Sequence, residues 1–395
     1  MRVLLVTSRF PLPPWRGNQM RSAEWLAALA GETRVLVAPE PQAPEHSGQL
    51  AGEGVSLVGF PLRWPGRAVG LAAALGSGRP LQEGLYDVAA ARGAVSRALE
   101  SHDPDVAVVQ MLRCGWALEV IRRARPGLPV VFDAIDAMGL HFERSEGAFP
   151  AAMRPMVRLE ARRCRRRERE LVDQATITCA VSQRDLDALG VEGDRGRVVP
   201  VAGREPASRE GGSDEPLVLL TGNLGYRPTV AGAEWFAEHV WPEVRRRCPA
   251  ARWVLAGARP ASRVRRLETL DGVDLEANVP DLAPFLARAA VALAPMAVGS
   301  GVPVKVLEAW AAGVPVVAHP WAAAGLAEDP APGVAVASSP EEWIAAVVRL
   351  LENRAAGDEL VRRGRAVWER HYRPAAVHDV IRAAVSAALE PRAEG

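Results

Sequence analysis

A lysine and a glutamate lie three residues apart in the apolar segment GSGVPVKVLEAWAAGVPVV, residues 299–317. Apolar runs on both sides predict buried parallel strands, and Pro303 and Gly313 mark the two ends of a helix between them. Lys305 and Glu308 then share one helical face within the first two turns. A helix amino terminus after a parallel strand offers N–H groups and a positive dipole to an anion. The segment predicts an anion site, with an ordinary surface ion pair as the alternative.

The elements that must position these residues alternate between strands and helices. The first half has strand patterns at RVLLVT, RVLVAP, DVAVVQ, VVFDAID, ITCAVS and RVVPV, the last at residues 197–201. The second half has them at LVLLTG, RWVLAG, VDLEANV (273–279) and VALAP. Residues 40–103 mix prolines and glycines with weak helical patterns and support no assignment. The alternation predicts an α/β fold with parallel sheets and right-handed crossovers.

The domain boundary is expected in a polar, glycine-rich and charged segment, residues 202–216, which has the composition of a linker. We assign residues 1–201 to an N-terminal Rossmann-like domain and residues 217–370 to a C-terminal one. The last segment, 371–395, predicts a helical tail with one apolar face. A length of 395 residues suits two domains.

Composition argues against several classes of protein. The formal charge of +1 gives no bulk attraction to nucleic acid. The four cysteines lack CxxC spacing and the seven histidines form no cluster, which argues against a zinc site or a disulfide framework. No apolar run is long enough to span a membrane, and the first one is too short for a signal peptide. We expect a cytoplasmic protein, soluble or peripheral to a membrane.

Four loops at the carboxyl ends of strands, where parallel sheets bind ligands, carry suitable residues. They are PLPPWRGNQMR with Gly17 and Asn18, TGNLGYRPT with Arg227, NVPD at 278–281, and GSGVPVK. No GxGxxG occurs, which disfavours a nicotinamide or flavin cofactor. Three of these loops belong to the second half, which is therefore predicted to hold a nucleotide. The first loop has a plain proline-rich turn as its alternative.

Residues 217–326 resemble the donor-binding domain of retaining glycosyltransferases of the GT-B fold, family-four type. The motifs TGNLGYRPTVAGAEWFAEHVWPEVRRRCP, WVLAGARP, NVPDLAPFLARAAVALAPMAVGSGVPVKVLEAWAAGVPVVA and AAAGL follow the order and spacing of that family. The first half is similar more loosely, through FDAIDAMG and RLEARRCRRRERELVDQ. Bacterial sugar transferases of surface-polysaccharide pathways are the most similar members. The resemblance implies two Rossmann-like domains facing across a cleft, and transfer of a sugar, typically a hexose, from a nucleoside-diphosphate sugar to an acceptor hydroxyl.

The resemblance also implies roles for individual residues of the second half. Glu308 matches the glutamate that binds the ribose hydroxyls, which suits a carboxylate with two acceptor oxygens. Lys305 and the amides of Ser300, Gly301 and Val302 would hold the diphosphate as it leaves with negative charge.

Further donor contacts are implied at the other loops. Asn223, next to Gly222, would lie against the phosphates, and Val279 of NVPD would border the base. Arg227 stands near the position of a basic residue of the family, with a solvent-facing arginine as the alternative. Gly17 and Asn18 resemble the small-residue loop that approaches the donor from the first domain.

Two positions depart from the family pattern. Ser300 stands where a glutamate often faces the donor sugar, and Ile135 stands where a histidine is frequent. Asp133 and Asp136 flank Ile135 and are candidates for catalysis on the acceptor hydroxyl, with strand-end caps or salt-bridge partners as the alternative. No paired-aspartate DxD motif follows a strand, so neither a divalent metal nor another cofactor is expected.

The segment RPMVRLEARRCRRRERE, residues 154–170, carries eight arginines and three glutamates. Clustered arginine attracts anionic lipid headgroups, so a peripheral membrane contact is one interpretation. The interleaved Glu160, Glu168 and Glu170 favour a solvated helix face instead. Aromatic residues are absent from the segment, which argues against a single-stranded nucleic acid site.

The leading hypothesis is a metal-independent retaining glycosyltransferase that uses a nucleotide-sugar donor and a small-molecule, glycan or lipid-linked acceptor. A nucleotide-sugar 2-epimerase on the same scaffold is the second, although such an enzyme would want more acid–base residues near the donor sugar. A non-catalytic nucleotide-sugar binder is the third. Release of free nucleoside diphosphate only in the presence of acceptor would support the transferase. Formation of an epimer would support the isomerase, and tight binding without any product would support the non-catalytic binder.

Overall fold

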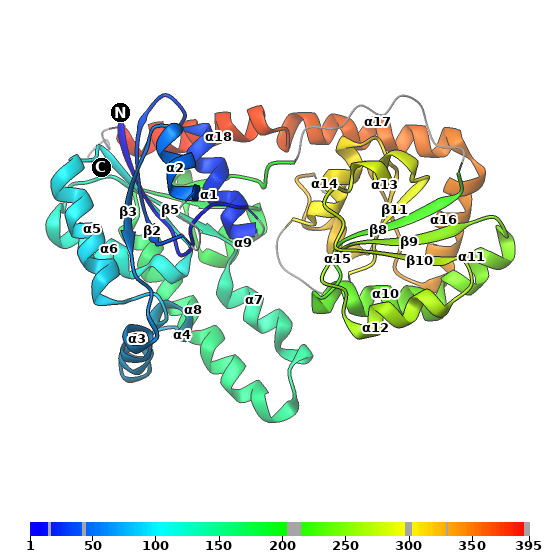
Figure 1. The fold of residues 1–395 in the computed structure, drawn as a ribbon, viewed down its shortest axis with the longest axis horizontal. Helices are drawn as coiled ribbons and strands as arrows, with labels where there is room; N and C mark the ends of the chain where they lie inside the picture. The colour runs from blue at the N-terminus through cyan, green and yellow to red at the C-terminus, as the bar shows by residue number, and fades with distance from the viewer. Residues whose placement is uncertain (15–16, 42–44, 204–214, 297–301, 329–330, 391–395) are drawn as a thin grey trace. The chain divides into compact units, whose positions relative to one another are not determined.

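A computed structural model describes residues 1–14, 17–41, 45–203, 215–296, 302–328 and 331–390 (Figure 1). The chain divides into two compact units. Unit 1 comprises Met1–Pro200 and Val377–Gly395, and unit 2 comprises Val201–Ala376. The chain therefore passes between the units twice, once after Pro200, just before the segment predicted as a linker, and once after Ala376.

Unit 1 contains a seven-stranded sheet in the order β3-β2-β1-β4-β5-β6-β7 in which every pairing is parallel. Its strands are β1 (Arg2–Val6), β2 (Thr33–Pro39), β3 (Val55–Phe60), β4 (Val106–Gln110), β5 (Val130–Ile135), β6 (Ile177–Ala180) and β7 (Gly196–Val198). The central strands β4 and β5 are buried along their whole length, as expected for a parallel sheet covered on both faces.

The helices of unit 1 are α1 (Gly17–Ala28), α2 (Glu45–Gly52), α3 (Trp64–Ser77), α4 (Leu81–Gly84), α5 (Ala89–His102), α6 (Trp116–Ala124), α7 (Met138–Ser145), α8 (Arg154–Gln174), α9 (Gln183–Leu189) and α18 (Pro374–Leu389). One continuous apolar core joins the sheet to α5, α6, α7, α8 and α9. The apolar face predicted for the tail is buried on α18, at Val377, Ile381, Ala384, Val385 and Ala388. This helix is joined to α1, where Arg382 Nη1 donates to Ala28 O at 3.0 Å.

Unit 2 contains a six-stranded, wholly parallel sheet in the order β10-β9-β8-β11-β12-β13. Its strands are β8 (Leu217–Asn223), β9 (Arg252–Ala258), β10 (Val273–Ala277), β11 (Val291–Ala294), β12 (Val316–Ala318) and β13 (Val334–Val336). Its helices are α10 (Arg227–His239), α11 (Trp241–Arg247), α12 (Ser262–Arg265), α13 (Ala283–Arg288), α14 (Val304–Ala311), α15 (Pro320–Ala323), α16 (Pro340–Glu352) and α17 (Arg354–His371). Two apolar cores cover the sheet, one around Trp310 and Trp368, the other around Phe236 and Trp343.

The predicted α/β class with two parallel-sheet, Rossmann-like domains is confirmed. The pattern missed β3 and β13, and β10 ends at Ala277 rather than at Val279, because Asn278 leaves the strand with φ of +56°. The strand predicted at 197–201 is shorter and begins earlier, at Gly196. Within the described residues, no helix is long and apolar enough to cross a membrane.

Candidate active site

The first candidate site lies where α14 begins. Pro303 is the N-cap residue, so Lys305 and Glu308 occupy the first two turns as predicted. Lys305 Nζ is buried and has no hydrogen-bond partner among the described residues. Burial lowers the pKa of Lys305 to about 8, although attraction to Glu308 raises it. A buried ammonium without a partner is unfavourable in the free protein, so this position suits an anionic ligand.

The end of β8 lies beside this lysine. Gly222 has φ of +120°, and a Cβ on it would come within 3.9 Å of Lys305 Nζ. A Cβ on Gly257 would lie 1.8 Å from Gly222 O, and one on Gly225 would lie 2.6 Å from Arg259 O. The glycines at the ends of β8 and β9 therefore allow the two strands to approach closely. This packing requires them whether or not a ligand binds.

The other residues predicted for the donor lie along the same sheet edge. Asn223 is exposed, and its Oδ1 accepts from Gly225 N at 3.0 Å. Arg227 is the exposed first residue of α10. Val279 is half-buried beyond β10, which is separated from β8 by β9.

The loop that precedes α14 is described only from its last residues onward. Val302 is half-buried and packs against the Trp310 core. Ser300 and Gly301 lie outside the described residues. Lys305, Glu308, Gly222 and Asn223 are thus brought together by the neighbouring strands β8 and β11, while Val279 stands farther along the edge.

Asp133, predicted as a catalytic carboxylate, is the fully buried partner of an arginine that the sequence analysis missed. Arg21 Nε and Nη2 donate to Asp133 Oδ2 and Oδ1, each at 2.9 Å. Gln110 Nε2 donates to Asp133 Oδ2, also at 2.9 Å. Both carboxylate oxygens are engaged, so the geometry favours the salt-bridge alternative for Asp133 over contact with an acceptor.

Arg21 completes this network from α1. Its Nη1 donates to Val199 O at 2.7 Å and to Pro200 O at 2.8 Å, the last residues before the chain enters unit 2. Burial alone would lower the pKa of Arg21, but the ion pair with Asp133 leaves it raised. The sequence pattern could have identified Arg21 as a buried residue, because it shares a helical face with Trp25 and Ala28, which are buried. An arginine on an apolar stripe needs a buried partner.

The start of α1 is connected to this network by hydrogen bonds. Gly17 is exposed, and no atom of the described part of the chain would lie within 4 Å of a Cβ built on it. Asn18 is half-buried, and its carbonyl accepts from Ser22 Oγ at 2.9 Å. Ser22 Oγ also donates to Gln110 Oε1 at 2.6 Å, which joins the loop residues to the Asp133 network.

Asp136 has a different environment from Asp133. It follows Ile135, whose φ of +65° is rare for a β-branched residue and marks local strain at the end of β5. Asp136 is half-buried. Burial and the negative charge of Asp185 raise the pKa of Asp136 to about 7, although Arg21 lowers it. A carboxyl group with a pKa near 7 at a strained strand end has the properties of a general base.

Two further carboxylates hold the turn after Asp136. Asp185 Oδ1 accepts from Ala137 N at 3.1 Å. Glu168 accepts from Met138 N at 2.5 Å and from Gly139 N at 3.2 Å, so it caps α7. Burial raises the pKa of Glu168 to about 7. These bonds fix the backbone that carries Asp136.

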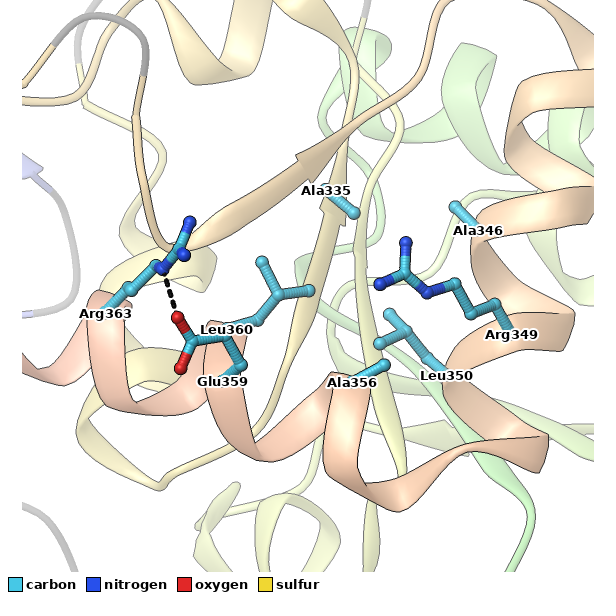
Figure 2. Close-up of a pocket in the computed structure, with 8 residues that line it drawn as sticks. All are labelled: Ala335, Ala346, Arg349, Leu350, Ala356, Glu359, Leu360 and Arg363. Atoms are coloured by element: carbon cyan, nitrogen blue, oxygen red, sulfur yellow. Dashed lines mark hydrogen bonds and ion pairs between the residues drawn. The ribbon is translucent and has the colours of Figure 1, made fainter.

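Two other observations concern ligands. Within the described residues, no three His, Cys, Asp or Glu side chains group closely enough to hold a metal ion. That the protein needs no metal stays a prediction. Residues of β13, α16 and α17 line a cavity of about 330 Å³. Figure 2 shows these residues, among them Arg363 paired with Glu359. Its lining includes none of the predicted site residues.

Comparison with known proteins assigns both halves to glycosyltransferases. Residues 19–202 match the family described as "Glycosyl transferase 4-like domain". Residues 215–353 match "Glycosyl transferases group 1". No curated protein matches the sequence.

Solved structures of the same fold cover nearly the whole chain. The sucrose-phosphate synthase of Thermosynechococcus elongatus has 16% identity and a TM-score of 0.68 over 98% of this chain and 100% of its own. HepE of Anabaena, in complex with UDP and glucose, has 14% identity and a TM-score of 0.63 over 98% of this chain and 99% of its own. The fold is thus of the GT-B class. With the two matched domains, the chain is identified as a GT-B glycosyltransferase.

Proposed function

We propose that the protein is a retaining, metal-independent glycosyltransferase of the cytoplasm, acting in polysaccharide biosynthesis. It would move a hexose from a nucleoside-diphosphate sugar to an acceptor hydroxyl. The observation that carries the proposal is that Lys305 Nζ, at the amino end of α14 and beside Gly222, is buried and has no hydrogen-bond partner among the described residues. A diphosphate is the ligand whose charge would satisfy this group. HepE was solved in complex with UDP, which supports a nucleotide ligand for this chain.

In this proposal the bond between the anomeric carbon and the diphosphate oxygen breaks, and the acceptor oxygen bonds to that carbon. Lys305 and the α14 dipole stabilise the charge that develops on the leaving diphosphate. Glu308 accepts hydrogen bonds from the ribose hydroxyls. Asp136, whose pKa is raised to about 7, receives the proton of the acceptor hydroxyl.

The proposal for Asp136 is tested by Asp136→Asn. We expect the turnover number to fall by about 10²–10⁴-fold, while the affinity for the nucleotide stays unchanged. In the parent protein the rate should rise with pH through about 7 as Asp136 loses its proton, and the variant should lose this dependence. A variant that keeps the pH profile of the parent would remove Asp136 from catalysis.

The folded protein should also show this titration in its stability. It holds the Asp136 proton up to a pH of about 7, whereas the unfolded chain releases it near the ordinary value of 3.8. The unfolded chain therefore binds fewer protons in this window, so this group lowers the free energy of unfolding as pH rises through it. The Asp136→Asn variant should lack that contribution.

The reaction itself is tested by mass spectrometry with a set of nucleotide sugars and acceptor extracts. Free nucleoside diphosphate formed only with acceptor, and a product with the donor's anomeric configuration by NMR, would support retaining transfer. Formation of an epimeric nucleotide sugar would support the isomerase alternative. Tight binding without turnover would support a non-catalytic binder. Activity that a chelator abolishes and Mg²⁺ or Mn²⁺ restores would contradict metal independence.

A further inference from the structure

Large apolar side chains are exposed together on two helices of unit 1. On α3, Trp64 is 66% exposed, Val69 70% and Leu75 57%. On α8, Met156 is 54% exposed and Leu159 47%. Exposed apolar residues are ordinary when they are scattered, but a concentration on neighbouring elements marks an interaction surface.

Helix α3 presents apolar residues to solvent along its length. Its sequence, WPGRAVGLAAALGS, holds one charged residue, Arg67, and only Gly70 and Ala74 are buried. A Cβ on Gly70 would lie 2.1 Å from Gly84 O, so these small residues let α3 pack closely on α4. The helix is therefore fixed to the unit by its narrow glycine–alanine side, and its broad apolar face points outward.

Helix α8 turns two of its acidic side chains inward, while Glu170 is partly exposed and Asp173 is exposed. Glu160 and Glu168 are buried, and Glu160 Oε1 accepts from Leu81 N at 2.7 Å. Arg162, Arg166 and Arg169 are exposed. The expectation that interleaved glutamates weaken the basic face is therefore wrong for Glu160 and Glu168. Arg167 is buried as well, and Arg166 Nε lies 3.6 Å from Glu170 Oε1. The exposed face of α8 still carries more arginine than acidic side chains.

The two helices adjoin one another. Arg166 Nη2 donates to the carbonyl oxygen of Gly78, the residue that caps α3, at 2.8 Å. Figure 1 draws α3, α4 and α8 at the same edge of unit 1. We define the α3–α8 surface by Trp64, Val69, Leu75, Leu159, Arg162, Arg166 and Arg169.

We propose that the α3–α8 surface docks the protein on a bilayer that contains anionic phospholipid. The apolar side chains of α3 would enter the headgroup region, as apolar helix faces do at bilayer interfaces. The arginines of α8 would bind the lipid phosphates, where each nearby basic residue adds about 1 kcal/mol. A second copy of this chain fits the surface less well, because symmetric pairing would bring its arginines together. The proposal extends the membrane contact predicted for residues 154–170 to α3, and it does not depend on transferase activity.

The test is binding of the full-length protein to vesicles of phosphatidylcholine with or without phosphatidylglycerol. We expect sedimentation with the anionic vesicles and little with the neutral ones. The emission of Trp64, isolated as the difference between the parent protein and Trp64→Phe, should shift to the blue on binding. Raising the salt concentration from about 0.1 to about 1 M should weaken binding, because it screens the arginines.

Paired variants separate the two contributions. The double variant Arg162→Glu with Arg169→Glu should weaken vesicle binding at least about 25-fold. Each lost positive charge accounts for about fivefold in affinity, and the two factors multiply. Val69→Ser with Leu75→Ser should weaken it about tenfold or more and abolish the shift of Trp64. The matched controls lie in unit 2, where Arg265→Glu with Arg266→Glu and Leu270→Ser with Val336→Ser change exposed residues of the same kinds. Both control pairs should bind as the parent does.

Several results would overturn the proposal. They are absence of binding to anionic vesicles, binding that survives both α3–α8 pairs, and an unshifted Trp64 emission in the bound protein. A dimer in sedimentation velocity that Val69→Ser with Leu75→Ser dissociates would show that a second copy covers α3 instead. Circular dichroism melts check that each variant is folded, which is expected because every substituted side chain is exposed.

Discussion

A buried cation lies at the carboxyl edge of the sheet in each unit, and the two differ in what surrounds them. Arg21 in unit 1 gives two hydrogen bonds to Asp133 and two to backbone carbonyls. Lys305 Nζ in unit 2 has no partner among the described residues. Folded proteins satisfy nearly all buried polar groups, so the arginine is explained by the structure itself. No group of the described residues satisfies the lysine, which is the basis for proposing an anionic ligand there.

The same contrast separates the two aspartates of the FDAID segment. Asp133 uses both oxygens within the protein, whereas Asp136 is half-buried with a pKa raised to about 7. A strongly perturbed pKa is a frequent property of functional groups. Residues that resemble each other in sequence can thus be sorted by whether the protein alone satisfies them.

The largest effect is expected from Arg21→Met, which removes the buried cation whose hydrogen bonds are satisfied within the protein. The substitution leaves Asp133 charged, buried and without its cation, and should lower the free energy of unfolding by about 3–5 kcal/mol. Urea titration followed by circular dichroism measures this change. A loss below about 0.5 kcal/mol, the usual size for surface substitutions, would contradict the structural role. Asp133→Leu added to Arg21→Met is the control and should recover part of the loss.

The matched experiment is Lys305→Met, which removes the buried cation that has no hydrogen-bond partner among the described residues. The turnover number should fall by about 10²–10³-fold, because the charge on the leaving diphosphate loses its cation. The free energy of unfolding without nucleotide should stay the same or rise by about 1 kcal/mol, because methionine fills similar volume without a buried charge. Initial rates and melting without ligand measure the two. Destabilisation as large as that of Arg21→Met would show that Lys305 is a structural residue.

Glu308→Ala tests the ribose contact on the same helix. Loss of a charge-assisted hydrogen bond should cost about 1.5–3 kcal/mol, which is about ten- to a hundredfold in affinity for the nucleoside diphosphate. Titration calorimetry measures the affinity, and the melting temperature should change little because the side chain is half-buried. Unchanged affinity for the correct nucleotide would place Glu308 outside the site.

The smallest effect is expected from pH. The pKa of Lys305 is lowered to about 8, so the ammonium is lost as pH rises through that value. Affinity for the nucleoside diphosphate should therefore fall severalfold between pH of about 7 and about 9. The same linkage acts on stability with the opposite sign. Above pH of about 8 the unfolded chain still binds this proton, so the free energy of unfolding without ligand rises with pH. Lys305→Met should remove both dependences.

Much of the fold followed from local sequence pattern. The strands β1, β4, β5, β8, β9 and β11 are short apolar runs between helical patterns, and all were predicted. The elements within residues 40–103 were not, because β3 carries Ser56 and Gly59 in a run of six residues. Helix α3 has no amphipathic pattern with a polar outer face. Such segments are recognised only once the rest of the sheet is in place.

What the sequence alone determined is the part that depends on spacing. Lys305 and Glu308 share a face at the start of a helix because helical periodicity and the Pro303 boundary are local properties. Tertiary structure decided which charges are paired. The bond between Arg21 and Asp133 joins residues 112 positions apart, and no periodicity relates them. It also decided that Glu160 points inward while its arginine neighbours face solvent. Whether a charged side chain binds a ligand or stabilises the fold depends on the groups, often distant in sequence, that pack around it. Those groups are placed by the whole fold.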